Sequence, residues 1–327
     1  MLVLFLFTVA QVVAVSAVND VLWCCSGSRV INCINLNQRN CENLNSQCVW
    51  GAFKSCPATP KKRVVLLPSK ISVNMVDLLW SRVSHSRPYM WDRNRSRASM
   101  KAASLSGFNV IRFAASGYWP VDHQLWFNIT TRPLFYSALD SVFEDAQLFN
   151  IQLIPSIMWN FFTVVDVCNE PMSQLMRNIS SCSYVQTKKY FTDIVQRYST
   201  TYNKNIYAWE IGNELNLEVD LSTPGSIAPQ MGTPTIRTSL DNFTTADMQL
   251  FQTNVLEWIH KTHYQQNGNQ NGINVKVSSG HAIPRTDAFH LRQSYYSKHR
   301  DWTHDTQQEY IQTILDQNQG FDLISMH

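Results

Sequence analysis

An amide and a carboxylate, Asn213 and Glu214, directly follow the apolar and aromatic run "IYAWEI" at residues 206–211. A strand needs neither group for its own stability, so their place at its end points to chemistry. Alternate residues of an extended strand share one face, which puts Glu210 and Glu214 on the same side. Glu210 then lies about 13 Å deeper, at roughly 3.3 Å per residue. We interpret Glu210 as a buried polar anchor, and Glu214 as either a catalytic carboxylate or a solvated loop side chain.

Polar and aromatic clusters follow other short apolar runs as well. They read "SGYWP" (116–120), "MWNFF" (158–162) and "GHAIP" (280–284). In a (β/α)8 barrel the rim at the carboxyl ends of the strands carries the active site, whereas the layered interior holds the fold. We therefore expect these clusters to meet Glu214 at one rim.

The elements that must position these clusters can be read from the hydrophobic pattern. The predicted strands cover residues 71–75, 108–114, 151–157, 206–211, 274–279 and 321–326. The predicted helices lie between them, at about 95–106, 134–148, 183–202, 244–263 and 305–317. Pro133 suits the start of the second helix. The motif Thr244-x-x-Asp247 is typical of a helix N-cap.

The predicted fold class is α/β: a (β/α)8 TIM barrel, incomplete, with about six of eight βα units. Strands that alternate with helices imply parallel βαβ units. No Gly-rich phosphate loop follows the first strand, which disfavours a dinucleotide-binding sheet. The expected boundaries are 1–17 for a signal peptide, 18–60 for a small Cys-rich disulfide segment and 64–327 for the partial barrel.

The composition narrows the classes of function. The 327 residues are 44% hydrophobic and 12% aromatic, which is enough for one large barrel. The formal net charge of +3 is too small to indicate a nucleic-acid or acidic-membrane partner. His260 and His263 share a helix face but lack the third ligand of a metal hydrolase. We therefore expect neither a metal nor another cofactor.

The N-terminal stretch "MLVLFLFTVAQVVAVSA" is short, apolar and ends in small residues, as in a secretory signal peptide. No later segment has the ~20 apolar residues that a membrane span needs. Four Asn-x-Ser/Thr sequons offer glycan sites in a secretory pathway: Asn94, Asn128, Asn178 and Asn242. We expect a secreted, extracellular protein or one of a lysosomal-type compartment.

Eight cysteines also favour an oxidising compartment. Six lie between Cys24 and Cys56, in a segment with too little periodic apolar content to fold without crosslinks. Irregular spacing and the absence of His there disfavour zinc, and the sequence does not choose among the disulfide pairings. The other two, Cys168 and Cys182, follow the third strand, where a disulfide would pin a loop beside the rim.

Three motifs resemble glycoside hydrolase family 5: "NVIRF" at 109–113, "WEIGNE" at 209–214 and "DLISMH" at 322–327. The resemblance covers about residues 64–327. It implies a (β/α)8 retaining β-glycosidase, related to cellulases and mannanases, that acts on β-linked glucan or mannan. Its partner would be an oligosaccharide or polysaccharide substrate. Related families, including heparanase-like glycosidases, carry similar Asn-Glu pairs.

The resemblance implies roles for individual residues. Glu214 matches the general acid/base that protonates the glycosidic oxygen, and Asn213 matches the amide that binds the sugar 2-hydroxyl. Arg112 matches the second-strand arginine that orients the nucleophile carboxylate. His327 matches the sixth-strand histidine that lines the subsite. Further substrate-binding candidates are Trp159, Asn160, Tyr118 and Trp119, whose three aromatic rings are either sugar platforms or core side chains.

One part of the family pattern is missing. Retaining hydrolysis needs a second carboxylate about 5 Å from the first, and the family supplies it after a seventh strand, which would follow His327. Glu210 lies too deep to replace it. We therefore expect a fragment of a longer enzyme that is inactive as it stands. The alternatives are a carbohydrate-binding pseudoenzyme that does not hydrolyse its ligand, and a heparanase-like glycosidase.

Overall fold

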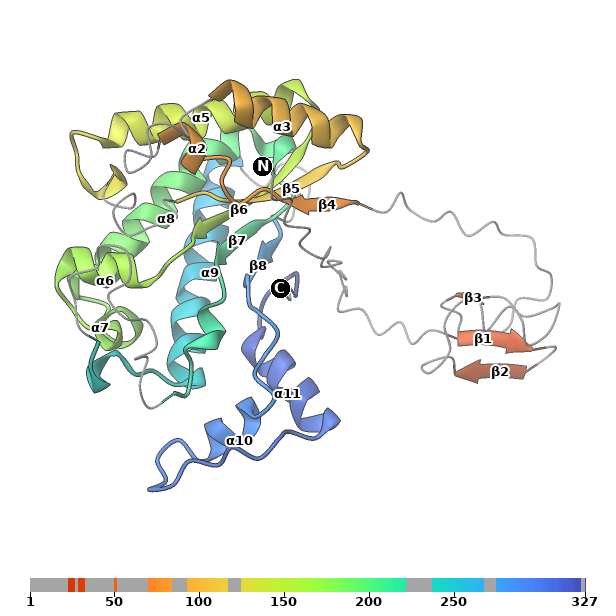
Figure 1. Cartoon of the computed structure of the whole chain (residues 1–327), viewed down its shortest axis with the longest axis vertical. Helices are drawn as coiled ribbons and strands as arrows, with labels where there is room; N and C mark the ends of the chain where they lie inside the picture. Colours follow the sequence, from red (N-terminus) through yellow and green to blue (C-terminus); the bar gives the residue numbers. More distant parts are fainter. Residues whose placement is uncertain are drawn as a thin grey trace, which may run out of the picture. The chain divides into compact units, whose positions relative to one another are not determined.

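The structure is a computed structural model, and Figure 1 shows how its elements are arranged. It describes residues 70–83, 93–116, 125–221, 237–267, 275–324 and 327, and the backbone of three short strands before residue 70. The predicted signal peptide (1–17), the side chains from Cys24 to Cys56, and Tyr118 and Trp119 lie outside the described residues.

The chain divides into two units, which we describe separately. Within Ser16–Ser69, three short strands form an antiparallel sheet in the order β2-β1-β3. These strands are β1 (Trp23–Ser26), β2 (Arg29–Asn32) and β3 (Trp50–Gly51). Disulfide pairing in this unit stays a prediction. The other unit contains the described residues from Lys70 to His327.

The second unit is built on a parallel sheet of five strands in chain order. They are β4 (Ser72–Asn74), β5 (Val110–Ala114), β6 (Gln152–Met158), β7 (Trp209–Gly212) and β8 (Val277–Ser278). Each strand is added beside the previous one, as in a (β/α) barrel, whereas the order of a doubly wound sheet reverses. Leu323 adds a parallel bridge to Ser278. The fold is therefore α/β, with consecutive βα units of an incomplete (β/α)8 barrel, as predicted.

The predicted sixth strand, 321–326, is shorter in the sheet than expected, but its end is paired again. The N–H of His327 donates to the carbonyl of His281 at 3.3 Å, and the N–H of Ile283 donates to the carbonyl of His327 at 3.4 Å. These two bonds have the pattern of a parallel ladder. His327 therefore lies beside the segment that follows β8.

The five predicted helices are confirmed within a few residues at each end. They are α3 (Arg93–Leu105), α5 (Arg132–Leu148), α8 (Cys182–Thr201), α9 (Thr245–Asn267) and α11 (Gln307–Gln317). Four shorter helices were not predicted because they span too few residues for a periodic signal. They are α2 (Trp80–Val83), α6 (Phe162–Cys168), α7 (Met172–Arg177) and α10 (Ala288–Gln293). The described residues also include the single turns η2 (Asn203–Asn205), η3 (Leu215–Leu217) and η4 (Ser239–Asp241).

Local signals place the helix starts correctly. Pro133 lies in the first turn of α5. At α9, Asp247 Oδ2 accepts from the N–H of Thr244 at 2.8 Å, and Thr244 Oγ1 accepts from the N–H of Asp247 at 3.2 Å. This reciprocal pair is a capping box. No helix within the described ranges is long and apolar enough to cross a membrane.

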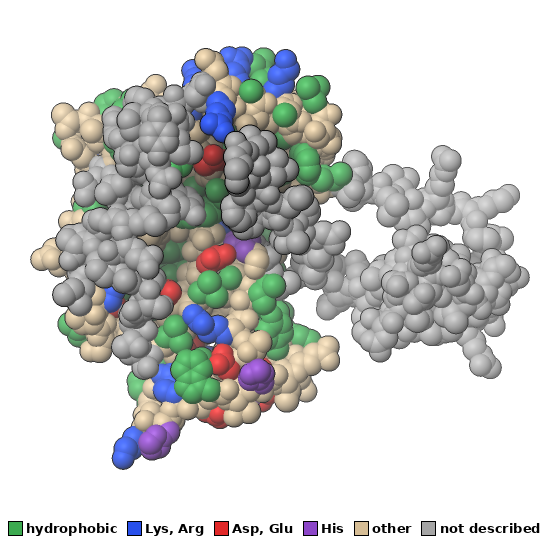
Figure 2. Space-filling view, in the orientation of Figure 1, with side chains coloured by type: hydrophobic (Ala, Val, Ile, Leu, Met, Phe, Trp, Pro, Cys, Tyr) green, Lys and Arg blue, Asp and Glu red, His purple; other side chains and the backbone are tan. Residues whose placement is uncertain are grey.

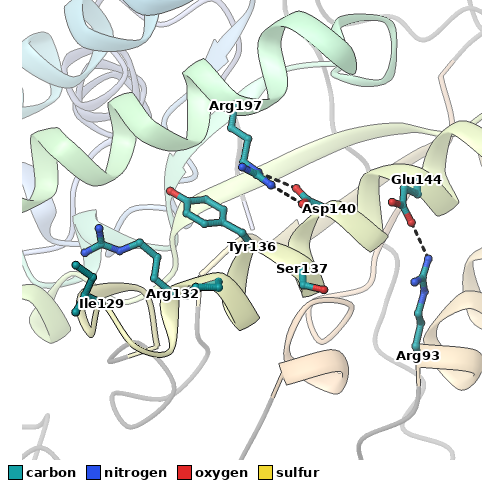
Figure 3. Close-up of a pocket in the computed structure, with 9 residues that line it drawn as sticks. Arg93, Ile129, Arg132, Tyr136, Ser137, Asp140, Glu144 and Arg197 are labelled. Atoms are coloured by element: carbon teal, nitrogen blue, oxygen red, sulfur yellow. Dashed lines mark hydrogen bonds and ion pairs between the residues drawn. The ribbon is translucent and has the colours of Figure 1, made fainter.

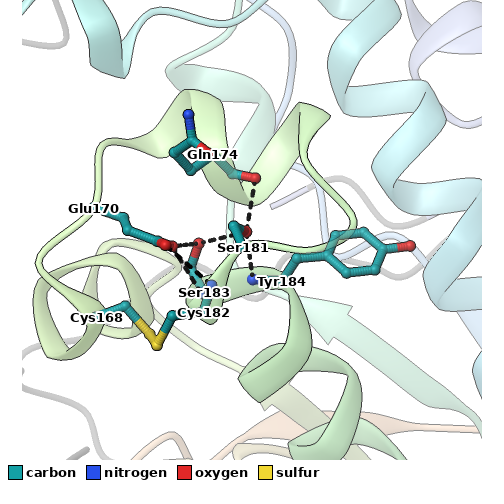
Figure 4. The surroundings of a disulfide bond; sticks show 7 residues. All are labelled: Cys168, Glu170, Gln174, Ser181, Cys182, Ser183 and Tyr184. Atoms are coloured by element: carbon teal, nitrogen blue, oxygen red, sulfur yellow. Dashed lines mark hydrogen bonds between the residues drawn. A yellow bond between two sulfur atoms is a disulfide. The ribbon is translucent and has the colours of Figure 1, made fainter.

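A disulfide joins Cys168, the last residue of α6, to Cys182, the first of α8, with Cα atoms 5.7 Å apart (Figure 4). Between them, the carboxylate of Glu170 accepts from the backbone N–H of Cys182 (3.0 Å) and of Ser183 (2.8 Å). Such N–H groups at a helix start have no intrahelical partner. The predicted Cys168–Cys182 bridge is confirmed, and Glu170 strengthens the same connection.

A buried cation, Arg82, fastens α2 to α3 and α5. Its guanidinium forms an ion pair with Asp145 at 2.8 Å, and both side chains are 2% exposed. It also donates to Ser96 Oγ and Ser141 Oγ, each at 2.7 Å. Burial lowers the pKa of Arg82, and the charge of Asp145 opposes that shift. Removal of Asp145 would leave a buried positive charge uncompensated.

We expect Asp145→Ala to lower the free energy of unfolding by about 3–5 kcal/mol, because a broken buried pair leaves one unpaired charge. The matched control is the neighbouring Glu144→Ala. Glu144 pairs with Arg93 at 2.8 Å, but both side chains are about half exposed. Loss of such a pair costs less than about 1 kcal/mol. Urea denaturation measures both changes, and equal losses would contradict the structural role of Asp145.

Candidate active site at the carboxyl ends of the strands

Arg112 and Glu210 form a buried ion pair inside the sheet's curved face. Arg112 lies on β5 and Glu210 on β7, with β6 between them. Nε of Arg112 donates to Oε1 (2.9 Å) and Oε2 (3.0 Å) of Glu210, and Nη2 lies 2.6 Å from Oε1. The two side chains are 8% and 1% exposed. Glu210 is thus a buried polar anchor, as predicted, and its partner is Arg112.

This pairing keeps Glu210 ionised. Burial by itself raises the pKa of Glu210. The charge of Arg112, helped by hydrogen bonding and by the neighbouring His327, outweighs burial and lowers the pKa to about 2. At neutral pH the pair of Arg112 and Glu210 therefore contains one fixed negative and one fixed positive charge.

The same guanidinium orients Asn213. Nη2 of Arg112 donates to Oδ1 of Asn213 at 3.0 Å. Since Oδ1 accepts this bond, the Nδ2 donors are the atoms of the amide that suit an oxygen of a ligand. On another side, Cζ of Arg112 lies 4.9 Å from the ring centroid of Trp159, a cation–π contact. Arg112 therefore contacts Glu210, Asn213 and Trp159.

The chain turns sharply at Glu214. Its φ of +56° and ψ of 31° are left-handed, which costs a non-glycine residue about 1–2 kcal/mol. The N–H of Glu214 donates to the carbonyl of Gly280 at 2.8 Å, which holds the turn. The side chain is 38% exposed and does not cap η3, which follows it. A strained, accessible carboxylate that makes no hydrogen bond to the residues the structure describes is typical of a functional position.

His327 lies between the two carboxylates. Its Nε2 is 3.7 Å from Oε2 of Glu210, and its Nδ1 is 3.8 Å from Oε1 of Glu214. Both distances exceed a hydrogen bond, and neither ring nitrogen has a hydrogen-bond partner in the part of the chain that the structure describes. Glu210 and Glu214 are closer together than an extended strand predicts, because β7 ends at Gly212. Figure 2 shows acidic and histidine side chains next to one another near the middle of this face.

The glycine of "GHAIP" lets the chain after β8 approach the ion pair. Gly280 has φ +70°, and a Cβ there would lie 1.8 Å from the carbonyl oxygen of Gly212 and 2.8 Å from Cδ of Glu210. Any side chain at position 280 would therefore displace Glu210. The close approach also provides the carbonyl that holds Glu214.

The two predicted sugar contacts after β6 are half-buried. The N–H of Trp159 donates to Ser116 Oγ at 2.9 Å. Oδ1 of Asn160 accepts from the N–H of Phe162 at 2.9 Å, at the start of α6. Asn160 thus supports a helix start with its carbonyl oxygen. The sugar-binding roles of Trp159 and Asn160 stay predictions.

Sequence reasoning missed three buried polar residues behind the rim: Asn216, Gln252 and His281. Nε2 of His281 lies 2.5 Å from Nε2 of Gln252. Burial, and then the nearby His327, lower the pKa of His281 to about 3, so the ring is neutral at ordinary pH. The place of His281 within "GHAIP" was the available signal. Asn216 and Gln252 carried none, because a buried amide looks like a surface amide in sequence.

A surface hollow of about 570 Å³ lies among α3, α5 and α8, away from these residues (Figure 3). Two of its three arginines pair with acidic side chains of the lining. Arg197 Nε donates to Asp140 Oδ1 at 2.8 Å, and Arg93 pairs with Glu144 at 2.8 Å. The hollow shares no residue with the rim site.

No protein-family model matches the chain, and no curated protein matches its sequence. Similar solved structures include an engineered glycoside hydrolase family 5 mannosidase from Rhizomucor miehei (14% identity, TM-score 0.41), over 68% of this chain and 53% of that one. The exo-beta-1,4-mannosidase Op5Man5 from Opitutaceae bacterium strain TAV5 is similar at 14% identity and TM-score 0.41, over 65% of this chain and 32% of its own. The virulence factor SghA, with the substrate analog salicin, is similar at 11% and 0.43, over 69% and 51%.

This chain thus spans about half or less of each of these three proteins. The first two are described as mannosidases, and the third as a virulence factor with its substrate analog salicin. The sequence motifs resemble the family of the first.

We expect Glu210→Gln to lower the free energy of unfolding by about 3–5 kcal/mol at neutral pH, because Arg112 loses its counter-charge. The pKa of Glu210 is lowered from 4.5 to about 2, so the pairing contributes fully above the higher value and is lost as pH falls through the lower one. The difference between wild type and variant should narrow over that interval by on the order of 3 kcal/mol. Urea denaturation from neutral pH to about pH 2.5 measures it. A constant difference would contradict the assigned ion pair.

Proposed function

We propose that this chain carries the acid/base side of a retaining β-glycosidase site, with Glu214 as the general acid/base. The observation that carries the proposal is the conformation of Glu214. An accessible carboxylate is held in left-handed backbone at the end of a barrel strand, beside Asn213 and His327. The substrate class, β-linked glucan or mannan, rests on the sequence resemblance.

The arrangement suits proton transfer to a glycosidic oxygen. Glu214 is exposed enough to meet a ligand, and among the described residues no helix cap or ion pair within hydrogen-bond distance holds its carboxylate. Asn213 has its Oδ1 engaged by Arg112, so its Nδ2 is the atom suited to donate to a 2-hydroxyl, a bond that strengthens in the transition state. His327 would line the same subsite with its ring nitrogens.

A second carboxylate is needed as nucleophile, and Glu210 is unsuited to that role. It is 1% exposed and both of its oxygens accept from Arg112. Glu170 and Asp220 are engaged elsewhere, since each accepts backbone N–H groups at a helix start. The nucleophile would therefore come from outside the described residues.

The second candidate function is carbohydrate binding without hydrolysis. The observation that favours it is the commitment of Glu210 to Arg112, which leaves Glu214 as the accessible carboxylate beside His327 in the described part of the rim. Calorimetric binding of a β-manno-oligosaccharide, together with the absence of turnover, would support this candidate over the enzyme.

Two variants test Glu214 through opposite effects. In a protein that includes the nucleophile, Glu214→Gly and Glu214→Gln should each lower hydrolysis of a β-manno-oligosaccharide, whose leaving oxygen needs a proton, by about 10²–10⁴-fold, because the proton donor is lost. Glu214→Gly should also raise the free energy of unfolding by about 1 kcal/mol, because glycine tolerates left-handed backbone. Glu214→Gln keeps the strain and should leave the stability unchanged.

The matched control is Asp220→Gly. Asp220 also has a positive φ, of 58°, but its carboxylate accepts from the N–H of Thr245 at 2.9 Å. Its replacement should therefore destabilise the protein. Unchanged turnover in both Glu214 variants would refute the assignment of the acid/base.

We also propose secretion with N-glycosylation, on the strength of the signal-like N-terminus, the Cys168–Cys182 bridge and the sequons. Asn94, Asn128 and Asn178 are exposed, whereas Asn242 is half-buried. On expression in a eukaryotic secretory pathway, we expect glycans at the first three. Peptide N-glycosidase digestion followed by mass spectrometry detects them, and a secreted product without glycans would contradict this proposal.

A further inference from the structure

Asn216, two residues after Glu214, joins three segments through one buried side-chain amide. It is 4% exposed. Its Nδ2 donates to the carbonyl of Ala282 (2.8 Å) and to Oε1 of Gln317 (3.1 Å), and its Oδ1 accepts from the N–H of Ala282 (2.9 Å). Both donors and the acceptor of the amide are therefore in use. The bonds connect the loop after β7, the segment after β8 and the end of α11.

The two bonds to Ala282 imitate a neighbouring strand. An amide that both donates to and accepts from one residue's backbone replaces the partner in a β-ladder. The main chain around Ala282 is paired with His327, through His281 (3.3 Å) and Ile283 (3.4 Å). Ala282 is thus held between the side chain of Asn216 and the backbone of His327.

The loop has a second attachment to the same segment. The N–H of Glu214 donates to the carbonyl of Gly280 at 2.8 Å. One attachment fixes the position of the loop relative to the segment after β8. Two attachments, at Gly280 and Ala282, also fix the orientation of the loop. The nearest atoms of Glu214 and His327 lie 3.8 Å apart within this frame.

We propose that Asn216 is a positioning residue that sets the distance and orientation between Glu214 and His327. This inference rests on the proposed acid/base role of Glu214. Without the amide, Ala282 loses both bonds to the loop, which keeps the bond at Gly280 and the bonds that the exposed side chain of Arg285 donates to the carbonyl of Leu217. A catalytic group misplaced by about 1 Å costs on the order of 100-fold in rate.

The test compares Asn216→Ala with Asn205→Ala. Asn205 donates one hydrogen bond to the carbonyl of Ile151 at 3.0 Å, near the opposite ends of the strands. In a protein that includes the nucleophile, kcat on a β-manno-oligosaccharide should fall about 100-fold in Asn216→Ala, with KM changed less than kcat, and should stay near wild type in Asn205→Ala. Asn216→Asp keeps an acceptor for Ala282 but lacks both donors, so it should give a smaller loss. It also serves as the variant if Asn216→Ala does not fold.

A readout that does not need turnover separates this inference from the proposed function. The ring resonances of His327, assigned by comparison with His327→Gln, should move in the Asn216 variants and stay in place in Asn205→Ala. Unmoved resonances in a folded Asn216 variant would overturn the positioning role. Moved resonances, together with the absence of glycoside hydrolysis by a wild type that includes the nucleophile, would instead refute the proposed function and leave the positioning role intact.

Discussion

The ion pair between Arg112 and Glu210 joins two strands that are separated by a third, and the rim depends on it. Two charges at this depth lose their hydration, which is repaid only when the geometry is close and the remaining hydrogen-bonding atoms are satisfied. Here both carboxylate oxygens accept from the guanidinium, which continues to Asn213 and lies against Trp159. Arg112 therefore holds the amide, the indole and the buried carboxylate of the site in one arrangement.

The strain at Glu214 persists because its surroundings over-determine it. The ion pair of Glu210 fixes the position of β7, and the chain continues from there to Glu214. The carbonyl of Gly280 then accepts from the N–H of Glu214, and the side chain of Asn216 binds the loop to the backbone of Ala282. An ordinary loop would not require glycine at position 280. The close approach requires glycine at position 280, because Glu210 and Gly212 fill the space where a Cβ would lie.

The outer helices are fastened by separate devices that do not involve the rim. Arg82 and Asp145 bury a second ion pair among α2, α3 and α5. The Cys168–Cys182 bridge and Glu170 fix the start of α8. Because these devices share no residue with the site, the stability of the scaffold and the chemistry of the rim can be changed independently.

Much of the fold and part of the site follow from local sequence. Helix periodicity, the helix start at Pro133 and the capping box at Thr244 act within a few residues. The positions of the long helices can therefore be predicted from the sequence. Four short helices were not predicted, because they have too few residues to show a hydrophobic period. The strand ends placed Asn213, Glu214 and "GHAIP" at one rim for the same local reason.

What the sequence by itself determined is therefore the alternation of strands and helices, and the pair of polar groups after the fourth strand. Only the tertiary structure decided which groups meet. Arg112 binds Glu210 across 98 positions, and Asn216 binds Gln317 across 101. The left-handed turn at Glu214 likewise depends on a carbonyl from Gly280. Contacts between residues so far apart arise from how the strands are wound side by side, and no local pattern encodes that geometry.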